Sequence, residues 1–342
     1  MKIGVLTGGG DCPGLNAVIR AIVRRSSSYG YGVLGIKKGW HGLIDGETEP
    51  LTNFSVSGIL HVGGTIIGTS RTNPFKKDES LQRLLENYRK FGIDALIAIG
   101  GEDTLGVANR LSQMGLKVVG VPKTIDNDVD GTDFTFGFDT AVTIVTEAID
   151  RLHSTAESHD RIMVVEVMGR NAGWIATFGG IAGGADIILI PEVPFDIDEV
   201  CNMIRKRHSR GKNFSIVVVA EGSKPKEMDQ PVTTSEQKDE FGHIKLGGIG
   251  SFLAAEIEKK TGYDTRVTVL GHIQRGGTPT AYDRVLATRF GVAAVDLIKN
   301  GIFGKMVAFH CNKIVTIDLS EAVGKLKTLD MEIYEIAKVF FG

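Results

Sequence analysis

Short apolar runs rich in β-branched residues recur along the chain, and most of them end in glycine or polar residues ahead of a helical pattern. The runs occupy residues 3–6, 33–36, 95–99, 118–121, 162–167, 187–190, 214–220, 266–270 and 306–310. Strands that alternate with helices in this way form parallel sheets covered by helices. We therefore predict an α/β protein built on doubly wound parallel sheets, with ligands at the carboxyl ends of the strands.

The length and charge of the chain limit the number of domains and the kinds of partner that we expect. At 342 residues it has about the length of two α/β lobes. Its 39 Lys and Arg nearly balance 41 Asp and Glu, so we expect no nucleic-acid partner. Three scattered cysteines, with no signal peptide and no apolar run of about 18 residues, favour a soluble cytoplasmic protein without a membrane partner.

Glycine is the compositional outlier, because 44 of the 342 residues are glycine, nearly twice the usual share of about 7%. Gly8, Gly9 and Gly10 follow the first apolar run and precede a helical pattern, an arrangement that can bind phosphate. Two common nucleotide motifs nevertheless fail. Pro13 stands where GxGxxG needs glycine, and GxxxxGK[ST] is absent. This loop alone therefore does not separate a phosphate site from a tight turn.

The stretch VVGVPKTIDNDVDGT, residues 118–132, carries the densest set of functional groups. Pro122 ends an apolar run, since proline cannot donate to a β-ladder. Asp126 and Asp128 lie two apart, so a loop could direct both carboxylates at one cation or one proton. Lys123 and Thr124 add a positive charge and a hydroxyl.

Two structural interpretations of this stretch compete with the functional one. Asp and Asn are common turn formers, so an Asx-rich turn remains open. A calcium loop fits at Asp126, Asp128, Asp130 and Gly131 but fails at its twelfth position, where Gly137 replaces the required glutamate.

Further polar residues follow other apolar runs. Glu102 and Asp103 come after the run 95–99, and acids in such a loop repel phosphate unless a cation bridges them. Either magnesium binds there or one acid excludes a ligand. Arg71 lies in a glycine- and serine-rich loop and is the kind of group that grips phosphate oxygens. His272 and Arg275, taken singly, are compatible with a core histidine and a solvated arginine.

Together these groups supply a carboxylate base, magnesium ligands, glycine loops and arginines, which is what phosphoryl transfer to a phosphorylated acceptor needs. The P-loop and protein-kinase motifs are missing. The polar segment 223–246 is predicted to be a surface excursion.

Five motifs, GGGDCPGLNAVIR, GGEDT, PKTIDND, MGRNAGW and GHIQRGG, occur in order between Gly8 and Gly277. With them the chain resembles the phosphofructokinase family. The resemblance implies two Rossmann-like lobes with the active site in the cleft between them. The donor and magnesium lobe would be residues 1–137 plus about 251–302, and the fructose 6-phosphate lobe about 138–250 plus 303–320. A C-terminal helix would occupy 321–342.

The resemblance also implies roles around the acidic stretch. Asp126 would be the base that takes the proton from the 1-hydroxyl of the sugar, with Thr124 and Ile125 lining the sugar. Glu102 would hold Mg²⁺, where many family members have aspartate. Asp128 would support the metal and the phosphate.

Substrate contacts are implied in the same way. The residues that would contact the donor are Gly10, Arg71, Asp103, Thr104 and Lys123. The residues that would contact fructose 6-phosphate are Met168, Gly169, Arg170, Glu221, His272 and Arg275. Arg170 would also neutralise transition-state charge. Arg161 and Arg266 would reach in from a neighbouring subunit, so a homodimer or homotetramer with shared sites is expected.

Two positions bear on the donor. Family members that use ATP typically have glycine in place of Asp103 and Lys123, whereas members that use pyrophosphate have Asp and Lys, as here. A carboxylate beside the α-phosphate position repels ATP. We therefore expect a reversible, pyrophosphate-dependent fructose 6-phosphate kinase. The alternatives are an ATP-dependent kinase of the same fold and, from another class, a non-catalytic nucleotide or sugar-phosphate sensor.

Overall fold

The structure, a computed structural model, describes the backbone of residues 1–342 and the side chains of all but residues 234–238 and 245. Its chain forms two compact units, each assembled from separate stretches of sequence. Unit 1 comprises Met1–Thr140, Asp239–His243 and Arg275–Leu326. Unit 2 comprises Ala141–Lys238, Ile244–Gln274 and Lys327–Gly342.

Unit 1 is built on a seven-stranded sheet of order β13-β12-β5-β4-β1-β2-β3. Its strands are β1 (Lys2–Thr7), β2 (Gly32–Ile36), β3 (Thr48–Leu51), β4 (Ala95–Gly100), β5 (Val118–Pro122), β12 (Lys305–His310) and β13 (Lys313–Asp318). The five inner strands are parallel, as predicted. The edge strands β3 and β13 are antiparallel to their neighbours and were not predicted. The sheet is therefore mixed.

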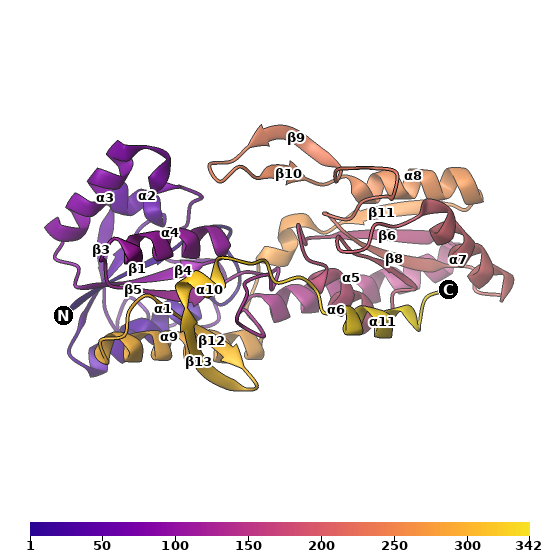
Figure 1. Ribbon diagram of the computed structural model, residues 1–342. Coiled ribbons are helices and arrows are strands. Elements are labelled where there is room, and N and C mark those ends of the chain that lie inside the picture. Colours follow the sequence, from indigo (N-terminus) through magenta and orange to yellow (C-terminus); the bar gives the residue numbers. More distant parts are fainter. The chain divides into compact units, whose positions relative to one another are not determined.

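Helices cover both faces of this sheet (Figure 1). They are α1 (Leu15–Ser28), α2 (Trp40–Asp45), α3 (Asp78–Lys90), α4 (Glu102–Gln113), α9 (Ala281–Lys299) and α10 (Leu319–Ala322), with a 3₁₀ turn η1 at Pro74–Lys76. Helices α1 and α9 pack together, and α4 packs on β4 and β5. Leu6, Leu96 and Leu105 belong to the buried apolar cluster between α4 and the sheet.

Unit 2 contains a four-stranded sheet of order β11-β6-β8-β7, in which every strand is parallel to its neighbour. Its strands are β6 (Ile162–Val167), β7 (Ile187–Leu189), β8 (Ser215–Ala220) and β11 (Thr265–Val269). The helical elements are α5 (Phe138–His159), α6 (Trp174–Ala182), α7 (Ile197–Ser209), α8 (Ile249–Thr261), α11 (Met331–Lys338) and the 3₁₀ turn η2 (Gly271–Arg275). Helices α7 and α8 pack on one face, and α6 and α11 on the other (Figure 1).

The two units divide the chain differently from the predicted lobes. Residues 251–274 lie in unit 2, because β11 pairs with β6. Residues 303–320 lie in unit 1, because β12 pairs with β5. The C-terminal segment contains α11 rather than one helix over 321–342, and α11 packs on α6 and β7.

The predicted surface excursion contains an antiparallel hairpin of β9 (Thr233–Lys238) and β10 (Ile244–Leu246). Its tip, Asp239–His243, belongs to unit 1. Among the described helices, none is both long enough and apolar enough to cross a bilayer.

The start of α9 contains a buried acid with an expected effect on stability. Asp283 Oδ2 accepts hydrogen bonds from the Thr140 backbone N at 2.8 Å and from Thr140 Oγ1 at 2.5 Å. Burial raises the pKa of Asp283 to about 6 from the ordinary 3.8. Folding therefore favours the protonated form, so this stabilisation is fully present below about pH 3.8 and is lost as pH rises from there through about 6.

Asp283→Asn is expected to remove this pH dependence, because the amide keeps an oxygen acceptor and never ionises. A shift of about two pKa units corresponds to about 3 kcal/mol. Relative to wild type, the variant should gain about 2 kcal/mol of unfolding free energy between about pH 4.5 and about pH 7.5, because part of the effect is already lost at pH 4.5. Urea unfolding at the two pH values measures this gain. An unchanged difference between the proteins would contradict the role given to Asp283.

Candidate functional site

The predicted donor residues gather at the carboxyl ends of β1, β4 and β5 in unit 1. After β1 the chain first adds β2 and β3 on one side of it and then β4 and β5 on the other side, so the direction of strand addition reverses at β1. Ligands of doubly wound sheets bind at such a reversal. The glycine loop follows β1, Glu102 and Asp103 follow β4, and Lys123 follows β5.

The glycine loop is held from three sides. Lys123 Nζ donates a hydrogen bond to the carbonyl oxygen of Gly10. Thr69 Oγ1 donates to the carbonyl of Gly9 at 2.7 Å. The Arg275 guanidinium lies where a Cβ at position 10 would be, so a larger residue there would displace this arginine. Lys123 is 3% exposed, and burial lowers its pKa. The hydrogen bond to Gly10 thus holds the Lys123 ammonium at the glycine loop, although burial disfavours its charged form.

Thr104 joins the ends of β1 and β4. Its side chain lies where a Cβ at Gly8 or at Gly100 would be. Gly8 N donates to the Ile99 carbonyl at 2.9 Å, which ties the two strand ends together. Thr104 is buried at 2% exposure. Thr104 therefore lies beside the predicted donor residues and also has a packing role that the sequence did not reveal.

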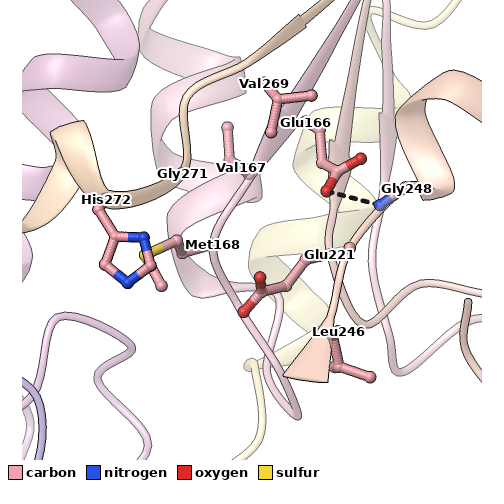
Figure 2. A pocket seen from close by; sticks show the side chains of 10 residues that line it. Glu166, Val167, Met168, Glu221, Leu246, Gly248, Val269, Gly271 and His272 are labelled. Atoms are coloured by element: carbon pink, nitrogen blue, oxygen red, sulfur yellow. Dashed lines mark hydrogen bonds between the residues drawn. The ribbon is translucent and has the colours of Figure 1, made fainter. Parts of the chain in front are cut away.

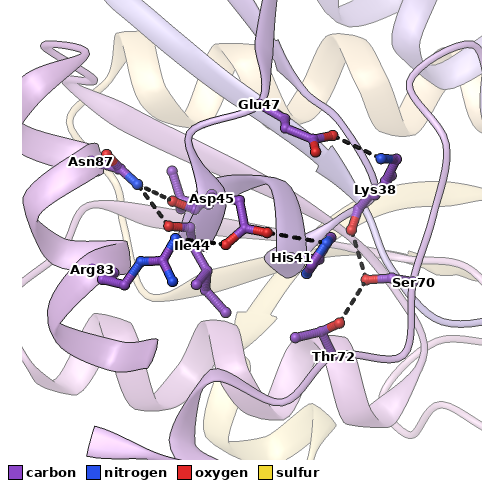
Figure 3. Close-up of polar contacts among 10 residues, drawn as sticks. Lys38, His41, Ile44, Asp45, Glu47, Ser70, Thr72, Arg83 and Asn87 are labelled. Carbon is purple, nitrogen blue, oxygen red and sulfur yellow. Dashed lines mark hydrogen bonds and ion pairs between the residues drawn. The ribbon is translucent and has the colours of Figure 1, made fainter. Parts of the chain in front are cut away.

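The segment that carries Arg71 is anchored at Ser70, the residue before the arginine (Figure 3). Ser70 Oγ donates to the Lys38 carbonyl at 2.6 Å and to Thr72 Oγ1 at 3.2 Å. Lys38 Nζ in turn pairs with Glu47 at 3.0 Å. The backbone beside Arg71 is thus fixed by neighbouring hydrogen bonds.

The tip of the β9–β10 hairpin contacts two of the predicted donor residues. Asp239 Oδ2 pairs with Arg71 Nη1 at 3.1 Å. His243 Nε2 lies 3.0 Å from Asp103 Oδ2. Sequence reasoning assigned nothing to this tip. The only local signal was a turn pattern, Asp239 and Gly242, which predicts a turn but not its neighbours.

The acidic loop after β5 is both an Asx-rich turn and a cluster of carboxylates. Asn127 is fully buried with φ 53°, in the left-handed region that Asn tolerates. Its Oδ1 accepts from Thr135 N at 3.1 Å, and its Nδ2 donates to the Asp133 carbonyl at 3.2 Å. Asp126 N donates to Thr124 Oγ1 at 3.0 Å. The turn and functional interpretations are therefore compatible, with Asn127 shaping the loop.

Like charges are concentrated in this part of unit 1. Burial, with added repulsion from Asp126 and Glu102, raises the pKa of Asp128 to about 7. Burial and the neighbouring Asp103 raise the pKa of Glu102. Both effects are those of carboxylates buried close to other acids. Within the described residues, three potential metal ligands come together in two groups, Asp133 with His310 and Cys311, and His41 with Asp45 and Glu47, and neither group contains Glu102 or Asp128.

Unit 2 contains a cavity of about 370 Å³ at the carboxyl ends of β6, β8 and β11 (Figure 2). Three predicted sugar-phosphate residues, Met168, Glu221 and His272, line it. The other lining residues are Glu166, Val167, Leu246, Gly247, Gly248, Val269 and Gly271. The structure thus brings together residues from three of the predicted strand ends.

Two buried side chains that sequence reasoning did not assign build this cavity. Glu166 accepts from Gly248 N at 3.2 Å and from Gly250 N at 2.8 Å, which fixes the start of α8. Gln274 Oε1 accepts from Met168 N at 3.2 Å, and Gln274 Nε2 donates to the Gly271 carbonyl at 3.0 Å. These bonds tie the wall that carries His272 to the end of β6.

The remaining sugar residues lie in several places. Gly169, with φ 137°, accepts from Gly222 N at 3.2 Å, so the loops after β6 and β8 meet backbone to backbone. Arg170 Nη2 donates to the Ile244 carbonyl at 2.5 Å. Arg170 and Arg275 do not line the cavity, and Arg275 belongs to unit 1.

Arg161 and Arg266 share one carboxylate. Arg161 Nε lies 2.6 Å from Asp264 Oδ2, and Arg266 Nη1 lies 2.7 Å from Asp264 Oδ1. Both arginines occur where the parallel strands β6 and β11 begin. The cavity lies where these strands end, roughly 20 Å away for six residues at about 3.3 Å each. The two arginines are therefore at the opposite edge of this sheet.

Comparison with known proteins agrees with this fold and its motifs. The phosphofructokinase family model matches residues 2–298. A Streptomyces coelicolor protein named pyrophosphate–fructose 6-phosphate 1-phosphotransferase is 58% identical, with both chains fully covered. A Mycobacterium tuberculosis protein named ATP-dependent 6-phosphofructokinase is 54% identical, also with full coverage. Pichia pastoris phosphofructokinase, in a T-state crystal structure, shares 34% identity and a TM-score of 0.85 over 99% of this chain and 36% of its own. The chain therefore belongs to the phosphofructokinase family.

Proposed function

We propose that this protein transfers a phosphoryl group reversibly from inorganic pyrophosphate to the 1-hydroxyl of fructose 6-phosphate, giving fructose 1,6-bisphosphate and phosphate. The observation that carries the donor assignment is Lys123, whose buried ammonium hydrogen-bonds to the glycine loop at Gly10. A fixed charge there suits a small, highly charged donor. The name of the Streptomyces coelicolor relative supports this donor. The name of the Mycobacterium tuberculosis relative favours ATP as the alternative.

In this proposal, Asp126 is the base. It takes the proton of the 1-hydroxyl as the sugar oxygen bonds to phosphorus, and the bridging P–O bond breaks with its electron pair leaving on phosphate. Lys123 and Arg170 neutralise charge that grows on the transferring group. Asp103 discriminates against donors with an α-phosphate.

Substrate binding follows the strand ends. The donor contacts are Gly10, Arg71, Asp103, Thr104 and Lys123. The contacts to fructose 6-phosphate are Thr124, Ile125, Met168, Gly169, Arg170, Glu221, His272 and Arg275, of which Met168, Glu221 and His272 line the unit 2 cavity. His272 and Arg275 are assigned to the 6-phosphate.

We assign Mg²⁺ to Glu102 and Asp128. Their carboxylate oxygens are the ligands that magnesium prefers, and their pKa values are raised by burial and by neighbouring acids, whose repulsion a cation would relieve. Mg²⁺ bound there would supply positive charge opposite the phosphate oxygens. We also place the protein in the cytoplasm, which the free thiols of Cys12, Cys201 and Cys311 support.

Reversal of the reaction tests the proposed function. The purified protein, given fructose 1,6-bisphosphate, inorganic phosphate and Mg²⁺, is expected to form fructose 6-phosphate and pyrophosphate. Phosphoglucose isomerase and glucose 6-phosphate dehydrogenase convert the sugar product into an NADPH signal. No phosphate-dependent signal, from protein that remains folded, would contradict the proposal.

We further propose a homo-oligomer, a dimer or a tetramer, in which Arg161 and Arg266 serve the fructose 6-phosphate site of a neighbouring subunit. The support is their position at the edge of the sheet opposite the cavity of their own chain. Arg161 and Arg266 together carry two positive charges against the single Asp264 carboxylate, so the cluster keeps a net charge for a phosphate.

Arg161→Ala and Arg266→Ala are each expected to raise the KM for fructose 6-phosphate about tenfold or more, with little change in the KM for the donor. Arg266→Ala mixed with the inactive Asp126→Asn variant should recover activity once subunits exchange, because some mixed sites then contain both residues. Steady-state rates before and after exchange measure this. Absence of recovery after confirmed exchange would place each site within one chain.

A further inference from the structure

The hairpin tip, Asp239–His243, is a compact turn fixed to unit 1. Asp239 Oδ1 accepts from Phe241 N at 3.0 Å and from His243 N at 2.9 Å. Phe241 packs against the apolar cluster of unit 1. Asn73 N donates to Glu240 Oε2 at 2.8 Å. The tip therefore has its own hydrogen bonds, an apolar anchor and a backbone contact next to the Arg71 loop.

His243 is centred on the carboxylate of Asp103. Its Nε2 lies 3.0 Å from Oδ2 and 3.2 Å from Oδ1, so one ring nitrogen contacts both oxygens. The side chains of Asp103 and His243 are 35% and 36% exposed, so the pair remains open to a ligand. Glu102 and Asp239 are the other acids that His243 influences, and Arg71 is paired with Asp239.

This contact resolves a difficulty at the donor site. Asp103 repels ATP, yet the same carboxylate also repels pyrophosphate, which concentrates its charge in a smaller volume. A partner that holds Asp103 in place and offsets part of its charge would let the short donor bind while the carboxylate still occupies its position. His243, which contacts both oxygens of the Asp103 carboxylate, is placed to be this partner.

We infer that His243 is a donor-specific positioning residue, which holds the Asp103 carboxylate so that pyrophosphate binds beside it. The inference rests on the proposed function for the identity of the donor. It assigns a role in the reaction to a hairpin tip more than 100 residues away from Asp103 in sequence.

Kinetics of His243→Ala test this role. We expect the KM for pyrophosphate to rise about fivefold, the size of a half-exposed ion pair, while the KM for fructose 6-phosphate changes by less than about twofold. In an Asp103→Asn background, the same substitution should change the pyrophosphate KM by less than about twofold, because the partner charge is gone. His243→Lys, which keeps a cation there, should restore much of the lost affinity.

His310→Ala is a matched control. It breaks a histidine–aspartate pair of 2.9 Å with Asp133 in the same unit, and it should leave the pyrophosphate KM unchanged. The inference is overturned if His243→Ala leaves the pyrophosphate KM unchanged, raises both KM values equally, or acts equally in the Asp103→Asn background.

Failure of the proposed function gives a different result. In that case wild type would use ATP and not pyrophosphate, and the same double-mutant cycle is run with the ATP KM. If the effect of His243→Ala on the ATP KM disappears in the Asp103→Asn background, His243 still acts by positioning Asp103. An effect that persists there, or no effect at all, overturns the positioning role.

Discussion

Replacing Asp126 by asparagine is expected to lower kcat by about two orders of magnitude or more, while the KM for fructose 6-phosphate stays near normal. A base acts in the transition state, so its loss reduces turnover rather than ground-state binding. The loop should keep its shape, because the Asp126 backbone N, which bonds to Thr124 Oγ1, is unchanged in asparagine. Steady-state kinetics with an aldolase-coupled assay of fructose 1,6-bisphosphate measures both constants.

Asp130→Asn provides the matched control, since it removes a carboxylate four residues along the same segment that has no assigned role. Its kcat should stay within about twofold of wild type. If Asp126→Asn retains comparable turnover, Asp126 is not the base, and another group must accept the proton.

Replacing Asp103 by glycine is expected to change the donor. The substitution removes a negative charge from the first turn of α4 and leaves space where the side chain was, so the variant should gain measurable ATP-dependent activity and lose pyrophosphate activity. Lys123→Gly alone should mainly weaken pyrophosphate turnover, because it removes an attraction and leaves the repulsion in place. Initial rates with each donor at saturating fructose 6-phosphate measure both effects.

Packing requires a second variant at Lys123. This side chain is buried, so glycine would also leave a cavity, whereas Lys123→Met keeps most of the volume and removes the charge together with its hydrogen bond to Gly10. The double variant of Asp103 and Lys123 should be non-additive, because both groups contact one ligand. A folded Asp103→Gly protein without any ATP activity would show that these two residues do not determine the donor.

The local parts of the site were predictable from sequence because each is a strand, a loop and a helix in direct succession. Residues 95–113 form β4 and α4, but α4 already begins at Glu102, so Glu102 and Asp103 lie in the first helical turn and not in a loop ahead of the helix. The strand ending at Pro122 leads into the carboxylate loop as expected. Periodicity and turn chemistry act over a few residues, so they place Glu102 and Asp126 at strand ends.

Pairing between distant segments was not predictable in the same way. Hydrophobic patterns do not say which strand lies beside which, so the assignment of residues 251–274 and 303–320 to the two units came out reversed. The contacts of Asp103 with His243 and of Arg161 with Asp264 join residues over 100 positions apart. Helices α3 and α7 were also missed, and both are largely polar with few buried residues, Leu84 in α3 and Val200, Cys201 and Ile204 in α7.

Donor choice is the central claim, and competition in one sample tests it most directly. Purified protein receives Mg²⁺, fructose 6-phosphate and equal concentrations of pyrophosphate and ATP, and ³¹P NMR follows every phosphorus species. The account predicts that the pyrophosphate signal falls as fructose 1,6-bisphosphate and phosphate appear, while the three ATP signals stay constant. Loss of the ATP γ-phosphate signal with pyrophosphate intact would contradict it.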